Sequence, residues 1–368
     1  MEQNYKRIVV KIGTSSLVDD MGSLSPEKLL RIVEQCVKLK RLGKEVILVS
    51  SGAIASGREI IKGLVGRRDL PAKQALAAVG QVRLMQYYSQ LFSLFHQPIA
   101  QILLTAEDLY DRKRYLNISN TFTILLKEGV IPIVNENDTV AVEEIKIGDN
   151  DTLSAKVACA VNADLLIILS DVEGVYTKDP HKDANAKLIS EIYEIDEEIE
   201  KLAGPGKGTG GMYTKISSAK IVMSAGIPMV LAKSDIPDVI IRIINGERIG
   251  TLFIPKKEHT QRKKHWLLFI TKPEGKVYID DGAITAILKK GKSLLPVGVK
   301  RIEGVFGSGD VVSICTLEGE EIGRGISNYS SLELSQIIGK TKEEIENQME
   351  LSYEEVVHRD NLVVIKND

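Results

Sequence analysis

Cysteine and histidine are scarce in this sequence. Cys36, Cys159 and Cys315 lie far apart, and only five histidines are scattered over the 368 residues. Without a Cys-x-x-Cys pair, this spacing favours neither a disulfide framework nor a zinc site. Isolated cysteines of this kind are typical of proteins from a reducing compartment.

The sequence also lacks an excess of one charge and any long apolar run. Its 48 basic and 50 acidic side chains nearly cancel, so no net field draws the protein to nucleic acid or to a membrane. The first residues contain no apolar segment of signal-peptide length, and no later run approaches the roughly eighteen apolar residues of a membrane span. We therefore expect a cytoplasmic protein.

Apolar runs divide the chain into two regions with different patterns. Up to Phe253, short β-branched runs alternate with helical patterns, which is typical of parallel βαβ units with helices on both faces of an open sheet. A polar, basic stretch follows, and then short strand-like runs separated by turn residues. We expect an α/β domain over residues 1–255, a linker over 256–275 and a small β-rich domain over 276–368.

The expected elements follow these patterns along the chain. Strands buried on both faces are expected at residues 7–13, 45–52, 98–105, 130–138, 164–171 and 227–234. The main helices are expected at residues 26–42, 71–95, 118–129, 151–163 and 214–226, and a further helix starts near Ala53. In the C-terminal region, strands are expected at 276–280, 298–304, 310–317 and 361–367, with a single helix at 330–339.

Residues at the ends of the predicted strands are the first candidates for chemistry, because ligands of open α/β sheets bind beyond the carboxyl ends of the strands. They combine a lysine, small residues, hydroxyls and carboxylates. The segments are Lys11 with Gly13 to Ser16, Ser50 to Ala53, Asn135 to Asp138, and Ser170 with Asp171.

Lys11 directly follows an apolar run. A solvated strand end is the ordinary explanation for a single lysine at such a place, because burying a charge without a partner is costly. Here, however, Gly-Thr-Ser-Ser follows, and its backbone amides and hydroxyls can bind phosphate oxygens. The start of the helix near Ala53 offers a second anion site, since the first amides of a helix lack internal partners.

Two clusters of Asp and Asn suggest binding of a polar substrate. Asp149, Asn150 and Asp151 precede a helical pattern, where one of them would suffice as the N-cap. The two carboxylates can orient a lysine or an Mg²⁺ shell, while the amide binds substrate. In the segment NEND, Asp138 with Asn135 can accept hydrogen bonds from an ammonium group, although a plain turn is an equal alternative.

The segment GTGGMYTK, from Gly208 to Lys215, is rich in glycine and ends in lysine. It is not a P-loop, because the lysine follows Thr214 and not a glycine. A flexible connector is one explanation. The other is a loop that closes over a nucleotide and brings Lys215 to the transferred phosphoryl group, with Lys11 as a second cation.

Taken together and in order, these motifs resemble the glutamate 5-kinase family of the amino acid kinase superfamily. The motifs are KIGTSSL, VSSGAIASG, KQALAAVGQVRLMQYY, IVNENDTV, IGDNDTLSA, SDVEGVYTKDP and GTGGMYTK. The later run SLLPVGVKRIEGVFGSGDVVSI, with DDGAITAIL before it, is similar to a PUA domain. Ser50 and Ser170 stand where the family often has threonine, which keeps the hydroxyl.

The resemblance implies ATP-dependent, Mg²⁺-assisted phosphorylation of the γ-carboxylate of L-glutamate to L-glutamyl 5-phosphate, the first step of L-proline biosynthesis, with feedback inhibition by proline. Lys11 and Lys215 would contact the phosphoryl group, and Asp151 would orient them. Glutamate would be bound by Ser51, Asp138 and Asn150, with Asn135 and Asp149 in support. Nucleotide contacts would come from Lys11, Ser170, Asp171, Thr209, Gly210, Gly211, Met212, Tyr213, Thr214 and Lys215. No residue is assigned as a direct metal ligand.

Partners and alternatives follow from the same resemblance. We expect a homo-oligomer and an interaction with a glutamyl phosphate reductase, and neither a membrane partner nor RNA. The nearest alternative is a related kinase acting on N-acetylglutamate, carbamate or a nucleoside monophosphate. Two other classes of function are an RNA-binding protein, through the PUA-like domain and the basic linker, and a glutamate sensor without catalysis.

Overall fold

The computed structural model describes residues 5–67, 69–110, 112–140, 150–180, 182–183, 185–202, 211–255, 272–341, 344 and 355–365. Two compact units make up the chain, Met1–His259 and Thr260–Asp368, and each has its own sheet and its own apolar core. No helix in these described ranges is long and apolar enough to cross a membrane.

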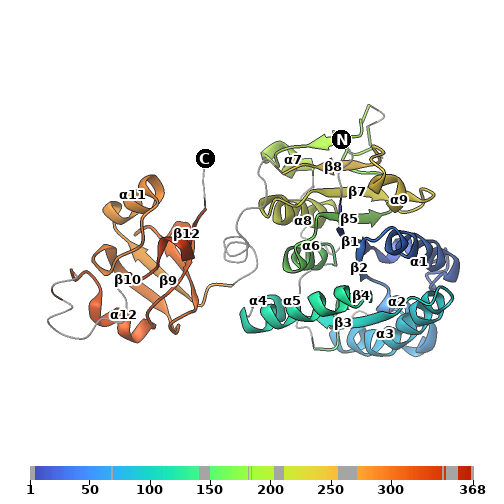
Figure 1. The fold of residues 1–368 in the computed structure, drawn as a ribbon, viewed down its shortest axis with the longest axis horizontal. Helices are drawn as coiled ribbons and strands as arrows, with labels where there is room; N and C mark the ends of the chain where they lie inside the picture. Colours follow the sequence, from blue (N-terminus) through green and yellow to red (C-terminus); the bar gives the residue numbers. More distant parts are fainter. Residues whose placement is uncertain are drawn as a thin grey trace. The chain divides into compact units, whose positions relative to one another are not determined.

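An eight-stranded sheet forms the centre of the N-terminal unit, in the order β3-β4-β2-β1-β5-β7-β8-β6 (Figure 1). Neighbouring strands are parallel except β7 and β8, which are antiparallel. The six predicted strands are β1 (Arg7–Ile12), β2 (Glu45–Ser50), β3 (Ile99–Leu104), β4 (Ile131–Glu136), β5 (Leu165–Ser170) and β7 (Met229–Lys233). The predicted α/β fold with a mainly parallel sheet is therefore confirmed.

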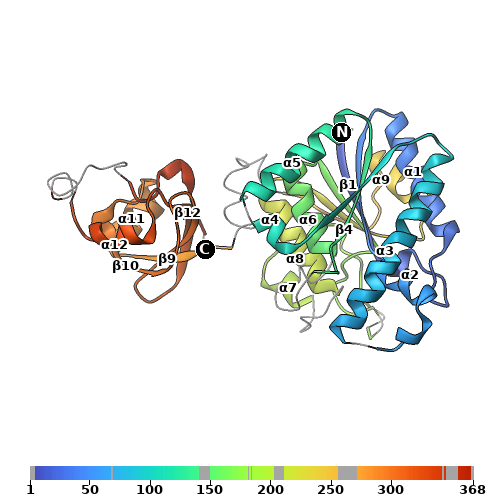
Figure 2. The same cartoon turned by 90° about the horizontal axis from the view of Figure 1, so that it is seen from below.

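Helices cover both faces of this sheet. Figure 2 shows α1, α3 and α9 on one side of the strands and α5, α6 and α8 on the other. The helices of the unit are α1 (Pro26–Arg41), α2 (Ala53–Ile60), α3 (Leu70–Ser93), α4 (Ala106–Tyr110), α5 (Arg112–Lys127), α6 (Asn150–Val161), α7 (Glu197–Leu202), α8 (Met212–Ser224) and α9 (Val239–Ile244). Helix α1 has the capping that its sequence predicts, because the Ser25 side chain accepts a hydrogen bond from Lys28 N and Gly43 has a left-handed φ of 75°.

The outer strands depart from the prediction. β3 was expected to be buried on both faces, but of its six residues only Leu104 is fully buried. It is the end strand of the sheet and pairs only with β4, so fewer elements cover it. At the other side, β6 (Glu191–Ile192) and β8 (Thr251–Phe253) were not predicted, because strands of two or three residues are too short to give an apolar run.

The C-terminal unit contains a five-stranded sheet in the order β10-β9-β11-β12-β13, which confirms the predicted β-rich character. Its strands pair antiparallel except β9 with β11. The bounds are β9 (Gly275–Ile279), β10 (Val299–Gly304), β11 (Val311–Cys315), β12 (Glu321–Ile326) and β13 (Leu362–Val364). The predicted helix forms as α12 (Ser331–Ile337), with a capping box between Ser330 and Glu333.

The expectation of a single helix in this unit was wrong. A second helix, α11 (Asp281–Lys290), begins after Asp280, whose carboxylate accepts a hydrogen bond from Ala283 N at 2.9 Å, and ends at Gly291 in a left-handed conformation. Strand β12 was also missed, since its sequence EIGRGI contains two glycines and two charged residues and does not look like a strand.

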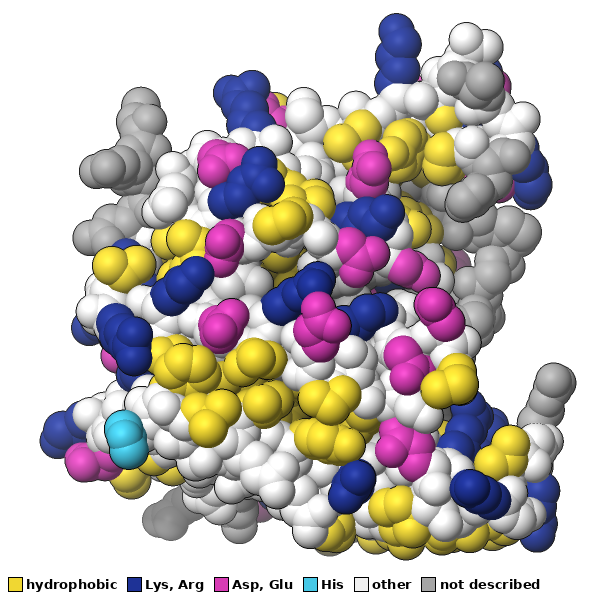
Figure 3. Space-filling view, turned by 90° about the vertical axis from the view of Figure 1, so that its right-hand side faces the viewer, with side chains coloured by type: hydrophobic (Ala, Val, Ile, Leu, Met, Phe, Trp, Pro, Cys, Tyr) yellow, Lys and Arg dark blue, Asp and Glu magenta, His cyan; other side chains and the backbone are white. Residues whose placement is uncertain are grey.

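The surface on the side of α1 and α9 carries both signs of charge. Lys and Arg side chains alternate there with Asp and Glu, and apolar side chains lie between them (Figure 3). This mixture agrees with the nearly balanced charge of the sequence.

Candidate active site

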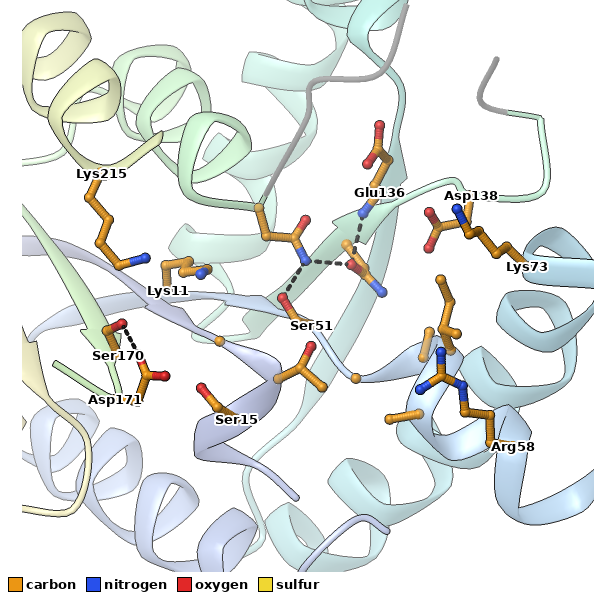
Figure 4. Close-up of a pocket in the computed structure, with 18 residues that line it drawn as sticks. Lys11, Ser15, Ser51, Arg58, Lys73, Glu136, Asp138, Ser170, Asp171 and Lys215 are labelled. Carbon is orange, nitrogen blue, oxygen red and sulfur yellow. Dashed lines mark hydrogen bonds between the residues drawn. The ribbon is translucent and has the colours of Figure 1, made fainter. Parts of the chain in front are cut away.

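A pocket of about 520 Å³ lies at the carboxyl ends of β1, β2, β4 and β5 (Figure 4). Because these strands are parallel, their carboxyl ends meet at one edge of the sheet, as the fold class predicts. The structure brings together eight predicted site residues in its wall: Lys11, Ser51, Asn135, Asp138, Asn150, Ser170, Asp171 and Lys215.

A buried carboxylate joins the two predicted catalytic lysines. Lys11 Nζ lies 2.5 Å from Asp151 Oδ1, and Lys215 Nζ lies 3.1 Å from Asp151 Oδ2. Asp151 is completely buried and Lys11 is 4% exposed, so the explanation of Lys11 as a solvated strand end is wrong. Each oxygen of one carboxylate thus holds one ammonium group, and both ammonium groups line the same pocket.

The elements around this cluster explain why it forms. Asp151 lies in the first turn of α6, where the helix dipole favours a negative charge. Lys215 lies in the first turn of α8, and the hydroxyl of the preceding Thr214 donates to Asp151 Oδ2 at 2.9 Å. Lys11 comes from β1 between β2 and β5, so residues far apart in the sequence meet at one point.

Asn150 is the centre of a second polar network. Its side-chain nitrogen donates to Ser51 Oγ at 2.8 Å and to Asn135 Oδ1 at 3.0 Å, and it also reaches the backbone oxygen of Ser50. Asn135 in turn donates to Gln81 Oε1 at 2.9 Å. Within the described ranges Asn150 Oδ1 is buried and has no hydrogen-bond donor, which leaves an acceptor for a bound ligand.

The two serines at the end of β2 lie in different surroundings. The Ser50 hydroxyl lies 2.8 Å from Tyr88 OH in the core, where burial is the main cause that raises the pKa of the Tyr88 phenol. Ser51 lines the pocket instead. Gly52 follows with a φ of 107°, a conformation that favours glycine, and the first residues of α2, Ala53 to Ala55, line the pocket with it.

The predicted nucleotide residues lie around the lysines. Ser170 is buried at the end of β5, and its hydroxyl donates to Asp171 Oδ1 at 2.9 Å. A Cβ atom at Gly13 would lie 3.6 Å from Lys11 Nζ, so glycine keeps the space beside this ammonium open. At the start of α8, Thr214 and Lys215 are buried, whereas Gly211, Met212 and Tyr213 do not line the pocket. Asp149, Thr209 and Gly210 lie outside the described residues.

Sequence reasoning assigned no function to four residues of this region. Arg58, Lys73 and Glu136 line the pocket, and Gln81 supports Asn135. Glu136 was among the strand-end candidates of the NEND segment, but no function was assigned to it. Arg58, Lys73 and Gln81 come from α2 and α3, and nothing in their local sequence shows that these helices reach the pocket.

Comparisons with known proteins agree with this arrangement. Residues 6–233 match the amino acid kinase family, and residues 275–349 match the PUA domain. The chain is 70% identical to a glutamate 5-kinase of Dictyoglomus thermophilum, over 98% of both chains. It is 50% identical to a glutamate 5-kinase of Carboxydothermus hydrogenoformans, over 99% of this chain and 98% of that one.

A solved structure supports the fold alone. The UMP kinase from Bacillus anthracis superposes with a TM-score of 0.50 at 19% sequence identity, covering 69% of this chain and 97% of that chain. The near full-length identity to the two relatives is far more specific. This chain is therefore a member of the glutamate 5-kinase family, an amino acid kinase that carries a C-terminal PUA domain.

Proposed function

We propose that the protein transfers the γ-phosphoryl group of ATP to the γ-carboxylate of L-glutamate, giving L-glutamyl 5-phosphate as the first step of L-proline biosynthesis. The observation that carries this proposal is the cluster of Lys11, Asp151 and Lys215 at the wall of the pocket. It supplies two positive charges in fixed positions beside an open space, in a member of the glutamate 5-kinase family.

Phosphoryl transfer to a carboxylate makes particular demands that this cluster meets. The γ-carboxylate of glutamate has an ordinary pKa of about 4.3, so it is already ionised at neutral pH and needs no general base. The main difficulty is to bring two anions together and to neutralise the charge on the transferred group. Lys11 and Lys215 can donate to that group, and Asp151 fixes both ammonium groups before the substrates arrive.

The glutamate-binding residues follow from the second network. Ser51, Asn150 and Asn135 are joined by hydrogen bonds next to the lysines, and Asn150 Oδ1 provides a buried acceptor. Asp138 lines the same pocket and supplies a carboxylate for the α-ammonium group of glutamate. The predicted support from Asp149 belongs to the same proposal.

ATP would enter from the side of Ser170, Asp171 and the start of α8. The segment Thr209 to Lys215 supplies the predicted contacts to its phosphates. Among the described residues no group of three or more His, Cys, Asp or Glu side chains is arranged to hold a metal ion. We expect Mg²⁺ to be bound mainly by the phosphate oxygens of ATP and by water, where the ion would neutralise charge on those oxygens.

The direct test is an assay of ADP formation with purified protein. We expect ADP only when both L-glutamate and Mg²⁺ are present, and trapping of the acyl phosphate by hydroxylamine as γ-glutamyl hydroxamate. A protein that phosphorylates N-acetylglutamate but not glutamate would contradict the proposal. ADP formation without hydroxamate would point to a different acceptor group.

Three further properties are proposed from the resemblance to the family. Proline should inhibit hydroxamate formation, the chain should form a homo-oligomer, and a glutamyl phosphate reductase should consume the unstable product. Inhibition is measured by titrating proline at fixed glutamate, and the oligomeric state by light scattering. Transfer to the reductase is measured by the rate of the coupled reaction in the presence of hydroxylamine as a competing trap.

A further inference from the structure

Two cations line the pocket wall on the side away from Lys11 and Lys215. Figure 4 shows Arg58 and Lys73 at the opposite end of the pocket from the two catalytic lysines, and Asp138 lies at the same end as these two cations. We propose that Arg58 and Lys73 bind the α-carboxylate of the amino-acid substrate and, together with Asp138, make the site specific for a free amino acid. This inference rests on the proposed function.

The two cations are held near each other by close packing of their helices. Arg58 lies in the last turn of α2, and Lys73 lies in the first turn of α3. A Cβ atom at Gly57 would overlap the backbone oxygen of Leu76, and one at Gly80 would overlap that of Ala53. The glycines thus let α2 and α3 approach closely, which brings both cations to the same end of the pocket.

Within the described residues, neither Arg58 nor Lys73 forms an ion pair with a carboxylate. The neighbouring Arg67 pairs with Asp69 at 2.9 Å, but no such pair involves Arg58 or Lys73. A lysine in the first turn of a helix is also disfavoured by the helix dipole, and the acidic side chain at the start of α3, the N-cap Asp69, has its ion pair with Arg67. Two cations at the wall of a pocket, without an ion-pair partner there, are suited to bind an anionic ligand.

The charges of glutamate match the charges along the pocket. Its γ-carboxylate must lie at the end of Lys11 and Lys215, where the phosphoryl group is transferred. Its α-ammonium and α-carboxylate are bonded to the same carbon, so their partners must also be neighbours. Asp138 and Lys73 line the same end of the pocket and provide such a pair, an acceptor for the ammonium and a donor for the carboxylate (Figure 4).

This arrangement gives a physical reason for selectivity. An N-acylated amino acid has lost its ammonium group, so it cannot donate to Asp138 from that position. An amine without an α-carboxylate would leave Arg58 and Lys73 unmatched in the same way. The two cations therefore determine substrate specificity, and the transfer step itself belongs to the cluster of Lys11, Asp151 and Lys215.

The test compares substrates in variants of the full chain. Lys73→Met and Arg58→Gln are measured with L-glutamate, with glutarate, which keeps both carboxylates, and with 4-aminobutyrate, which lacks the α-carboxylate. Glutamate is measured as a substrate, and the two analogues as competitive inhibitors of hydroxamate formation. Lys62→Met is the matched control, because Lys62 is an exposed cation of the same segment that does not line the pocket.

We expect Lys73→Met to lower kcat/KM for glutamate by about 10- to 100-fold, the range for loss of a charge-assisted hydrogen bond. Glutarate binding should weaken by a similar factor, and binding of 4-aminobutyrate by less than about twofold. Arg58→Gln should show the same selectivity with a smaller loss, because Arg58 is exposed. The KM for ATP should not change, and Lys73→Arg should restore most of the loss.

Equal losses for glutamate and 4-aminobutyrate would overturn the inference, because they would show that the cations only balance charge or support the fold. A loss for Lys62→Met as large as that for Lys73→Met would overturn it as well. Hydroxamate formation by the wild-type chain tests the proposed function separately. If the wild-type chain forms no hydroxamate from glutamate, both the proposed function and this inference fail.

Discussion

The two units of the chain differ in whether they bury charged side chains. In the N-terminal unit, four charged side chains are buried in the described ranges: Lys11, Asp151, Lys156 and Lys215. In the described part of the C-terminal unit, Ser313 and Ser327 are the only buried polar residues. Its ion pair between Lys300 and Asp280 is partly exposed, at 45% and 32%. The described part of the C-terminal unit thus has a core without a buried charge. Of the four buried charges in the first unit, Lys156 donates to Tyr110 OH at 2.9 Å, whereas Lys11, Asp151 and Lys215 form the cluster at the pocket and call for a functional explanation.

Sheet topology explains where the cluster of Lys11, Asp151 and Lys215 is found. The parallel strands β1, β2, β4 and β5 direct their carboxyl ends to one edge, and helices begin there. The mainly antiparallel sheet of the C-terminal unit alternates the ends of its strands between its two edges. Polar groups at strand ends therefore gather at one place in the first unit and are spread over two edges in the second.

The largest contrast between the units should appear when one carboxylate of each is neutralised. Asp151→Asn removes the carboxylate that pairs with the buried Lys11 and Lys215, and removing one member of a buried ion pair costs about 3 to 5 kcal/mol of stability. Asp280→Asn removes a partly exposed pair and should cost less than about 1 kcal/mol. Denaturant unfolding of both variants, followed by circular dichroism, measures the difference. Similar losses in the free energy of unfolding would show that burial does not make the ion pairs of Asp151 more important for stability than that of Asp280.

The second-largest contrast is expected in kcat, when one lysine of each unit is replaced by alanine. Lys215→Ala removes the ammonium group that we propose as a donor to the transferred phosphoryl group, so we expect kcat to fall by about 100- to 1000-fold while the KM for glutamate changes little. Lys300→Ala, the control in the C-terminal unit, should leave kcat unchanged. Initial rates of hydroxamate formation measure both. A rise in KM for glutamate at constant kcat would exclude a function of Lys215 in the transfer step.

Close helix contacts provide a third comparison. Gly80→Ala places a methyl group against the backbone of Ala53, and overpacking of this kind costs about 1 to 3 kcal/mol. Gly282→Ala in α11 is the control, because a Cβ atom there would meet only Asp280 Oδ1, at 3.3 Å. Thermal unfolding compares the two variants. An unchanged melting temperature for Gly80→Ala would mean that α2 and α3 can separate without cost.

The smallest effect concerns pH in the C-terminal unit. A hydrogen bond from Ala283 N, helped by the ion pair with Lys300, holds the pKa of Asp280 below its ordinary value of 3.8. The stabilisation by this N-cap is therefore complete above pH 3.8 and is lost as the pH falls through the lower folded pKa. Hydrogen exchange in the first turn of α11 should be slower in the wild type than in Asp280→Asn at pH 6, and this difference should shrink at pH 3. If the difference in hydrogen exchange were the same at pH 6 and pH 3, the lowered pKa of Asp280 would be contradicted.

Much of the fold was predictable because its main strands are strongly apolar. β1, β2, β4 and β5 are buried almost throughout, and their sequences show it. The short strands β6 and β8 and the glycine-containing β12 escaped, since pairing with neighbours and not local sequence stabilises them. Helix α11 was overlooked although Asp280 and Gly291 provide ordinary capping residues.

The site was predictable where its residues end strands or begin helices. Lys11, Ser51, Asn150 and Lys215 lie at such places and meet in one pocket. The resemblance to the family implied that Asp151 orients both lysines, whereas the packing of α6 and α8 that lets one carboxylate reach both ammonium groups cannot be read from the local sequence. Arg58, Lys73 and Gln81 depend in the same way on the packing of α2 against α3.

The position of Asp151 between two lysines also bears on how the products leave. Its carboxylate competes with phosphate oxygens for the same ammonium groups, so binding of an anion there is weaker than at two lysines alone. An enzyme that must release two phosphorylated products after every cycle needs such a limit on their affinity. We expect Asp151 therefore to shorten the time for which ADP and the acyl phosphate remain bound.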